Sequence, residues 1–301
     1  MSVKDSPGLQ ARLFVALQHL VPQHFLSHLV YYVTRSRIAL VKNLLIRSFV
    51  RGFRPDMTEA VRTDPLSYAS FNEFFTRILR PAARPIDPNA SILVSPVDGT
   101  ISQIGRLEGS QLMQAKGHHY SLEALLDPAA QWVPRFAGGA FATLYLAPFN
   151  YHRIHMPLTG TLRAAWYVPG RLFSVNAATA AAVPGLFARN ERILCLFEEG
   201  PLSFAMILVG ALFVGSMATV WHGEVTPRKP RQVIELPLDG GQAPLRLEKG
   251  AEMGRFNMGS TVILLLPRTA GDWLAGKDAG DRIRVGQPLA QLRASMLADY
   301  G

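Results

Sequence analysis

Short β segments separated by glycine and proline turns recur from about residue 91 onward, and this pattern constrains the fold more than any other feature. The segments are rich in aliphatic and β-branched residues, which are typical of buried strands. Their regular spacing favours a closed or sandwich-like β core, that is, a barrel or a sandwich. The strands that we expect are 92–94, 100–104, 140–146, 160–167, 192–197, 204–209, 220–225, 232–236 and 261–266.

One apolar run, residues 204–220, carries no formal charge and approaches the length of a membrane span. Gly210, Gly215 and Ser216 interrupt it. We therefore expect two buried strands joined by a tight turn. The single cysteine, Cys195, lies in another apolar run, so no internal disulfide is possible, and a small buried hydrophobe is a better interpretation than a nucleophile.

The first 54 residues follow a helical periodicity instead. Leucines recur at positions 9, 13, 17 and 20, and apolar residues at helical spacing continue to position 45. Pro22 separates the first two segments. We expect about three amphipathic helices in residues 1–54, followed by a β-rich domain in residues 55–301, and hence an α+β protein.

Residues 13–34 hold no Asp, Glu, Lys or Arg, which raises the question of a transmembrane helix. Pro22, two glutamines and three histidines within this stretch argue against one. Residues 1–60 contain eight basic and three acidic side chains, more than half of the net charge of +9. A basic, apolar-faced helical segment fits a region that lies on a membrane surface. Packing on the body of the protein or on a second subunit is the alternative.

The positive net charge predicts anionic partners, which include nucleic acid, anionic lipid and acidic substrates. The charges cluster with aliphatic stripes, and no aromatic–basic pattern of an RNA-binding protein occurs, so nucleic acid is disfavoured. The first residues lack a basic stretch that leads into an apolar segment with a small-residue cleavage site. We therefore expect no secretory signal.

Two short motifs hold residues suited to chemistry. Residues 95–100 read Ser-Pro-Val-Asp-Gly-Thr and place Asp98 in a turn before a strand; the motif also resembles the entry of a biotinyl- or lipoyl-type hairpin. Residues 150–157 read Asn-Tyr-His-Arg-Ile-His-Met-Pro and contain His152 and His155. Two histidines at this spacing could ligate a metal, but no third ligand pattern accompanies them. Acid–base work near neutral pH is the alternative.

A third motif, residues 256–261, reads Phe-Asn-Met-Gly-Ser-Thr and leads into an expected strand. A turn that begins a strand is the plain interpretation. Gly259-Ser260 is also suited to cleavage of its own backbone, because glycine leaves its carbonyl accessible. Serine supplies a hydroxyl that can attack this carbonyl when a base takes the proton.

Each motif alone is a weak signal, but all three in this order resemble the phosphatidylserine decarboxylase family. Further segments that carry the resemblance, within residues 71–267, are Phe71-Asn-Glu-Phe-Phe-Thr-Arg77, Arg84-Pro85, Lys116-Gly117, Tyr120-Ser-Leu122, 207–211 and 214–216. The chain departs from the family pattern at Met258, where leucine is common, and at Ala218, where an acidic residue is expected. The first exchange conserves volume and apolar character and should be tolerated. The second puts a local contact in doubt.

The resemblance implies an enzyme that converts phosphatidylserine to phosphatidylethanolamine and carbon dioxide without a metal. Its cofactor would be a covalent pyruvoyl group made from Ser260, which forms a Schiff base with the substrate amine and accepts the electrons left by carbon dioxide. Asp98, His155 and Ser260 would form a charge relay for autocleavage, by the logic of a Ser-His-Asp triad. His152 would assist decarboxylation or reprotonation.

Autocleavage between Gly259 and Ser260 would give a β chain, 1–259, and an α chain, 260–301, that stay together. By the same resemblance we expect a homodimer, bound peripherally to the cytoplasmic face of a bacterial inner membrane, with phosphatidylserine and the anionic membrane surface as partners. Two other functions remain open. One is a pyruvoyl decarboxylase of a soluble amino acid. The other is a non-catalytic membrane-binding β protein, which would keep its chain intact.

Overall fold

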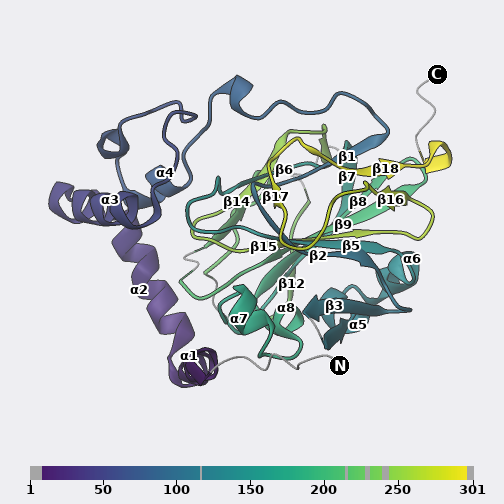
Figure 1. The fold of residues 1–301 in the computed structure, drawn as a ribbon, viewed down its shortest axis with the longest axis horizontal. Helices are drawn as coiled ribbons and strands as arrows, with labels where there is room; N and C mark the ends of the chain where they lie inside the picture. The colour runs from purple at the N-terminus through teal and green to yellow at the C-terminus, as the bar shows by residue number, and fades with distance from the viewer. Residues whose placement is uncertain (1–8, 116, 214–215, 228–230, 239–243, 297–301) are drawn as a thin grey trace.

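The structure, a computed structural model, describes residues 9–115, 117–213, 216–227, 231–238 and 244–296. Three helices stand at one side of a body built of β-strands (Figure 1). The helices are α1 (Leu9–Leu20), α2 (Gln23–Arg35) and α3 (Ala39–Phe53). The three helices predicted for the N-terminal region, and the break at Pro22, are thereby confirmed.

The core of the body is a nine-stranded antiparallel sheet in the order β12-β7-β8-β9-β15-β5-β2-β17, with β13 paired to β7. Its central strands β9 and β15 are buried along their whole length, as expected of continuous apolar runs. The strands are β2 (Gly99–Arg106), β5 (Ala140–Tyr145), β7 (Gly160–Val168), β8 (Arg192–Glu199), β9 (Leu202–Val209), β12 (Ile234–Glu235), β13 (Arg246–Leu247), β15 (Thr261–Leu266) and β17 (Arg282–Ile283). Cys195 is fully buried in β8, which confirms its prediction as a core residue.

Two smaller sheets and a hairpin complete the β structure, with the orders β11-β10-β14-β6, β1-β18-β16 and β3-β4. Their strands are β1 (Ile92–Val94), β3 (Gln111–Ala115), β4 (His118–Ser121), β6 (Arg153–His155), β10 (Met217–Thr219), β11 (Gly223–Glu224), β14 (Glu252–Phe256), β16 (Gly271–Trp273) and β18 (Pro288–Leu292). The chain leaves β14 in one sheet and enters β15 in another. Residues 257–260 therefore cross between two sheets.

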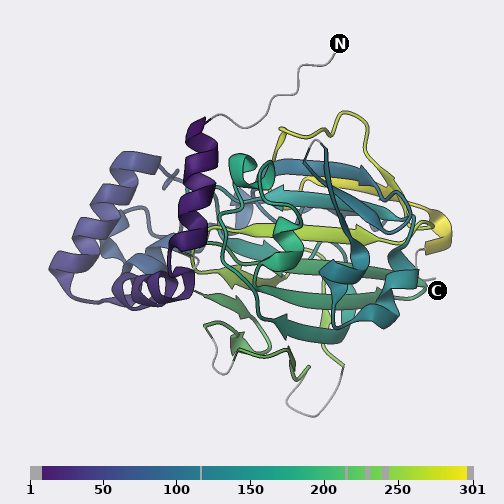
Figure 2. The ribbon, with the colours of Figure 1, turned by 90° about the horizontal axis from the view of Figure 1, so that it is seen from below.

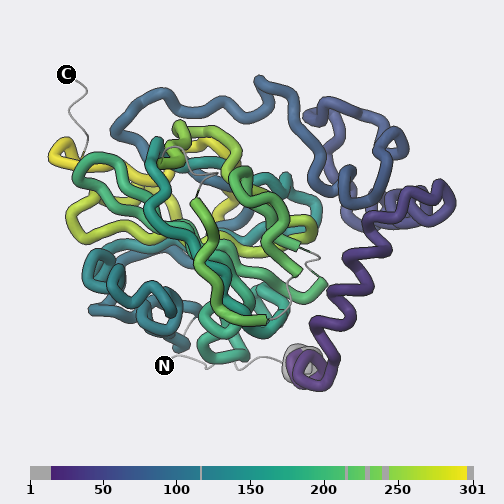
Figure 3. The backbone as a smooth tube through the Cα atoms, turned by 180° about the vertical axis from the view of Figure 1, so that it is seen from behind, coloured from purple at the N-terminus to yellow at the C-terminus, as the bar shows by residue number. Residues whose placement is uncertain are grey.

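Short helices fill the connections: α4 (Phe71–Phe75), α5 (Leu122–Leu126), α6 (Val133–Phe136), α7 (Ala177–Ala180) and α8 (Leu186–Arg189). Seen from below, the strands of the body run side by side away from the three N-terminal helices (Figure 2). The connection from α4 to β1 passes along the outside of the body (Figure 3). It thereby links the helical part to β1, the strand that precedes the motif at residues 95–100.

The predicted β-rich α+β class is confirmed, and the strands expected at 92–94 and 261–266 are found with those bounds. Within the described residues, however, the main sheet ends at β12 and β17 without closing, so the barrel alternative is wrong. The two buried strands predicted within 204–220 are found as β9 and β10, but the two strands belong to different sheets and do not pair with each other. Residues 214–215 of the predicted tight turn lie outside the described part. The strand expected at 220–225 is a turn followed by the two-residue strand β11.

Helix α2 presents polar side chains to the body and apolar ones outward, the reverse of an ordinary surface helix. On α2, Gln23 and Ser27 are buried, whereas Phe25, Leu29 and Tyr32 are 67%, 52% and 61% exposed. Other exposed apolar residues of the three helices are Leu17, Leu20, Leu40, Leu44 and Phe53. Apolar surface of this extent marks contact with a membrane or another protein. No helix in the described part combines the length and apolar character needed to span a bilayer.

Helix α3 is held to the body by aromatic packing. Ile46 and Phe49 join a buried cluster with the phenylalanines of α4. Met258 packs against this cluster and also against the main core of the body. The segment before Gly259 therefore contacts the cluster that α3 and α4 share, and Nδ2 of Asn72 in α4 also donates to the Asn257 carbonyl at 3.1 Å.

Candidate active site

The Gly259-Ser260 dipeptide lies immediately before β15, where that strand sits between β5 and β9. Ser260 is fully buried, its carbonyl oxygen accepts a hydrogen bond from the Leu146 amide at 2.8 Å, and its hydroxyl donates to the Val209 carbonyl. A Cβ atom at position 259 would lie 3.2 Å from the Leu146 carbonyl oxygen and 3.3 Å from Nε2 of His152. These are tight contacts, so the site accommodates glycine better than any larger residue.

Of the other predicted site residues, His152 is the one that lies against Gly259 in the described structure. A turn at residues 147–150, closed by the bond from the Asn150 amide to the Ala147 carbonyl (2.9 Å), places it there. Its Nδ1 is 2.8 Å from the Asn150 carbonyl, which can only accept, so Nδ1 carries the proton. Nε2 is buried and has no hydrogen-bond partner within the described structure.

The surroundings of His152 keep its imidazole neutral. Its ring packs against Phe75, with the centroids 4.1 Å apart. Burial, assisted by the nearby charge of Arg77, lowers the pKa of His152 to about 3. The site therefore contains a neutral imidazole whose unshared electron pair on Nε2 is available beside Gly259.

His155, on β6, faces a different set of partners. Its Nδ1 is 2.7 Å from the Gly250 carbonyl and donates to it, and its Nε2 is 3.1 Å from the Tyr151 hydroxyl. Burial lowers the pKa of His155 from 6.5. The described residues show no hydrogen bond between the side chains of His155 and Ser260.

Asp98 occupies the crossing from β1 to β2, which belong to different sheets, so its segment does not join the two strands of a hairpin. Its carboxylate accepts hydrogen bonds from Nε of Arg84 at 2.8 Å, from Nη2 of Arg84 at 2.5 Å and from the Val285 amide at 2.9 Å. Arg84 also pairs with Glu59 at 2.8 Å. The carboxylate of Asp98 is thus occupied by Arg84 rather than by His155.

Arg77 is a residue whose role the sequence did not reveal. It lies two positions after α4, is only 3% exposed, and donates from Nη2 to the Phe149 carbonyl at 3.2 Å. Nε and Nη1 are buried without a partner in the described structure, and burial lowers its pKa. With Asp98 and Tyr151 it lines a cavity of about 250 Å³. An isolated buried guanidinium is costly, which points to an anionic ligand.

The structure therefore gathers the predicted residues into one region but does not link them into a relay. His152 lies against Gly259, the residue before Ser260, while His155 and Asp98 are engaged by Tyr151 and Arg84. Within the described part of the chain, no group of three or more His, Cys, Asp or Glu residues could hold a metal ion.

The two departures from the family pattern have ordinary surroundings. Met258 is half-buried between the two hydrophobic clusters, where its flexible side chain fills the space. Ala218 is buried in β10, opposite Glu224 of β11 and Arg255 of β14. Ala218 therefore lies between two charged cross-strand neighbours, although it carries no charge itself.

Comparisons with known proteins match nearly the whole chain. The family model described as phosphatidylserine decarboxylase matches residues 71–291, and a second model, described as PSD, matches residues 13–54. A phosphatidylserine decarboxylase proenzyme of Bordetella pertussis is 51% identical over 93% of this chain and 94% of its own length. Proenzymes of the same name from Shewanella denitrificans and Bordetella avium are 51% and 48% identical, over 93% and 99% of this chain and 98% and 99% of their own lengths.

Proposed function

This chain belongs to the phosphatidylserine decarboxylase family, and we propose that it becomes active by cutting its own backbone between Gly259 and Ser260. As a member of the family it is a carboxy-lyase that converts phosphatidylserine to phosphatidylethanolamine and carbon dioxide. The relatives are named proenzymes, which accords with maturation by cleavage. The observation that carries the proposal is the Gly259-Ser260 dipeptide, with Ser260 fully buried and Gly259 beside the unpartnered Nε2 of His152.

Cleavage begins when the hydroxyl oxygen of Ser260 attacks the carbonyl carbon of Gly259 and a base takes the hydroxyl proton. The amide bond breaks, an ester forms in its place, and the amino group of residue 260 is released. β-Elimination expels the carboxylate of Gly259 and leaves dehydroalanine at position 260. Addition of water and loss of ammonia then produce the pyruvoyl group at the start of chain 260–301.

We assign the proton-accepting role in cleavage to His155, oriented by Asp98, in the manner of a Ser-His-Asp triad. The His155 amide donates to the Pro96 carbonyl at 2.8 Å, two residues from Asp98. Burial is the main cause that lowers the pKa of His155, and the charge of Asp98 acts in the opposite direction. For the relay to operate, Nε2 of His155 exchanges Tyr151 for Ser260, and its Nδ1 exchanges the Gly250 carbonyl for Asp98. Asp98 must also release Arg84.

His152 is assigned to decarboxylation, because a neutral imidazole next to position 259 can give or take a proton at the reaction centre. The same geometry favours one competing assignment, in which His152 is the base for cleavage. The two assignments differ in a simple way. If His155 is the base for cleavage, only its replacement leaves the chain uncut. If His152 is the base, replacement of His152 leaves the chain uncut.

A pyruvoyl group at position 260 suits the residues around it. The position is fully buried, which shields a reactive carbonyl from water, and the unpartnered Nε2 of His152 is at hand for proton transfer. Such a group supplies an electron sink for the bond to the departing carboxyl carbon, which no ordinary side chain offers. The chain's own residues supply the rest, namely binding, orientation and proton transfer.

Arg77 is assigned to the anionic headgroup of the substrate, which carries a carboxylate and a phosphodiester. Its free Nε and Nη1 are charged donors of the kind that bind the oxygens of such groups, one hydrogen bond from each side of the guanidinium. It lines the 250 Å³ cavity that also contains Asp98 and Tyr151. A bound anion would provide the partner that this buried guanidinium lacks.

The N-terminal helices are proposed to lie on the anionic surface of the membrane, peripherally, on the cytoplasmic face of a bacterial inner membrane. The outward apolar faces of α1 and α2 support this placement, as do the basic residues around them. A homodimer is proposed as the assembled form, and 1–259 and 260–301 as its paired chains. A soluble amino acid as substrate is disfavoured, because it would leave the apolar helical surface without a role.

Denaturing mass spectrometry of the purified protein tests the proposal. We expect two fragments, 1–259 and 260–301, with the smaller one lighter by one ammonia than the unmodified peptide. Ser260→Ala serves as the matched control, because it cannot form the ester and should stay intact and inactive. An active preparation that contains only the uncut chain would refute autocleavage and the pyruvoyl cofactor together.

The membrane proposal has its own test in the full-length chain. Phe25→Glu with Leu29→Glu places two charges on the outward face of α2, where both side chains are more than half exposed. We expect weaker co-sedimentation with anionic vesicles, whereas Met113→Glu, an exposed apolar residue on β3, should bind like the unaltered protein. Equal binding of both variants would contradict the membrane role of α2.

A further inference from the structure

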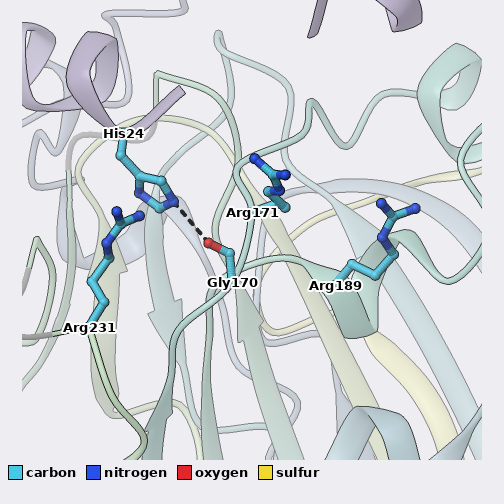
Figure 4. A pocket seen from close by; sticks show the side chains of 5 residues that line it. All are labelled: His24, Gly170, Arg171, Arg189 and Arg231. Carbon is cyan, nitrogen blue, oxygen red and sulfur yellow. Dashed lines mark hydrogen bonds between the residues drawn. The ribbon is translucent and has the colours of Figure 1, made fainter. Parts of the chain in front are cut away.

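A hollow of about 500 Å³ lies where α2 meets the loop that follows β7. It is lined by His24, Gly170, Arg171, Arg189 and Arg231 (Figure 4). The guanidinium group of Arg231 points toward the ring of His24, and Arg171 lies across the hollow from it (Figure 4). None of these residues belongs to the proposed catalytic set.

The three arginines bring positive charge together without a carboxylate to balance it. Arg171, Arg189 and Arg231 take part in no ion pair within the described residues. Arg189 makes a long hydrogen bond, 3.4 Å, to the Pro184 carbonyl, and its guanidinium lies 5.2 Å from the centre of the Phe173 ring. All three arginines are exposed, so water screens their mutual repulsion, and an anion that entered the hollow would be attracted by their combined charge.

One acid, Glu191, lies near enough to Arg231 for that charge to act on its pKa, but its carboxyl group already has a hydrogen-bond partner. Glu191 is buried and accepts a hydrogen bond from the Tyr167 hydroxyl at 2.9 Å. Burial raises the pKa of Glu191 to about 7, so this carboxyl group is only partly charged at neutral pH. It therefore leaves much of the charge of the hollow uncompensated.

His24 links the hollow to the membrane-facing helix. Its Nε2 lies 2.9 Å from the Gly170 carbonyl, which can only accept a hydrogen bond. Burial, followed by the charges of Arg231 and Arg171, lowers its pKa. At about 100° per residue, His24 stands on the flank of α2, between its buried polar face and the exposed face of Phe25 and Leu29.

We propose that this hollow binds the phosphate of an anionic glycerophospholipid in the membrane surface, at a position separate from the substrate site. Arginine forks match phosphate oxygens, and the neighbouring apolar face of α2 would receive the acyl chains. The proposal rests on the membrane association inferred above. It adds a defined headgroup site to what would otherwise be a diffuse attraction between charges.

The first experiment compares full-length variants in co-sedimentation with phosphatidylglycerol and phosphatidylcholine vesicles. Arg171→Gln with Arg231→Gln should bind phosphatidylglycerol vesicles about thirtyfold more weakly, since each arginine near the surface contributes roughly fivefold. Arg171→Lys with Arg231→Lys keeps the charge but loses the two-pronged donor, and it should also bind more weakly than the unaltered protein. Arg268→Gln removes one unpaired exposed charge outside the hollow and is the control.

The second experiment follows the His24 ring by NMR, with its signal assigned from its loss in His24→Gln. Soluble short-chain phosphatidylglycerol should raise the pKa of His24, because a bound anion offsets the nearby arginines. Inorganic phosphate at the same concentration should have a much smaller effect. An equal effect of inorganic phosphate would make the hollow a general phosphate site and overturn the assignment to a lipid.

The remaining outcomes separate this proposal from the membrane association on which it rests. If the double glutamine variant binds vesicles as well as Arg268→Gln does, the headgroup site is wrong. If the lysine variant binds as well as the unaltered protein, only diffuse charge is at work, and the site is again wrong. Loss of binding in Phe25→Glu with Leu29→Glu, together with normal binding of the arginine variants, would keep the membrane role and reject the hollow.

Discussion

Replacement of Gly259 by alanine tests the geometry of the cleavage site directly. The new methyl group would lie 3.2 Å from the Leu146 carbonyl oxygen and 3.3 Å from Nε2 of His152, both closer than ordinary contacts. Gly259 is not among the residues with positive φ, so the backbone itself accepts alanine. Any effect must therefore come from these two contacts, and a shift of a few tenths of an ångström is needed to relieve them.

The size of the effect follows from the cost of that shift. Overpacking of this kind costs about 1–3 kcal/mol. If the scissile peptide moves, its carbonyl carbon leaves the position that the Ser260 hydroxyl attacks, and the barrier to cleavage rises by a similar amount. At about 1.4 kcal/mol for each tenfold change in rate, cleavage should slow roughly 5- to 150-fold.

The assay is a time course of the 260–301 fragment after cell-free synthesis, followed by denaturing electrophoresis. Gly105→Ala is the matched control, because it lies in β2 and its new methyl group would meet only the Phe141 ring at 3.9 Å. This control should be cut at the normal rate. Normal cleavage of Gly259→Ala would refute the reasoning, and equal slowing of Gly105→Ala would show a general loss of packing instead.

Three further predictions concern single side chains of the site. His155→Ala should stay uncut, whereas His152→Ala should be cut but should lose decarboxylation, as seen by denaturing mass spectrometry and product analysis; two uncut variants would contradict the division of roles. Arg77→Met should lower kcat/KM for phosphatidylserine about 10- to 100-fold through loss of a charged hydrogen bond. Its unfolding temperature should stay the same or rise, because an unpaired buried charge disappears, and a fall in that temperature with unchanged KM would indicate a structural role. Burial lowers the pKa of His152 from 6.5 to about 3, so between these values the unfolded chain binds the proton first. Stability is therefore fully present above pH 6.5 and is lost as pH falls toward 3. Thermal unfolding at pH 7 and pH 4 should show a smaller loss in His152→Gln than in the unaltered protein, and equal losses would count against a buried neutral His152.

Local patterns allowed the strands and helices to be predicted where burial follows the chain itself. Residues 262–266 are all apolar because β15 is covered on both faces, and a continuous apolar run can be recognised without knowing its neighbours. Local patterns were less informative at 204–220, where closeness in sequence suggested two strands joined by a tight turn. Strand β9 pairs with the preceding β8 and with the distant β15, whereas β10 pairs with β11 and with β14 in another sheet. The sequence between β9 and β10 does not reveal this change of sheet.

The order of Asp98, His155 and Gly259-Ser260, and the chemistry of those residue types, were available from the sequence alone. The same holds for the three N-terminal helices and for the basic charge around them. These features depend on residue identity and on spacing over short stretches, and both can be read directly from the sequence. Family resemblance then connected the motifs to one reaction.

Only the tertiary structure decided which groups meet. In the folded protein, Nε2 of His152 lies beside Gly259, and Arg84 binds the carboxylate of Asp98. The buried guanidinium of Arg77 has two nitrogen atoms without a described partner. The fold also turns the polar face of α2 inward and its apolar face outward. The physical reason is the same in each case: hydrogen bonding and burial depend on neighbours brought together from distant parts of the chain, and no local pattern specifies those neighbours.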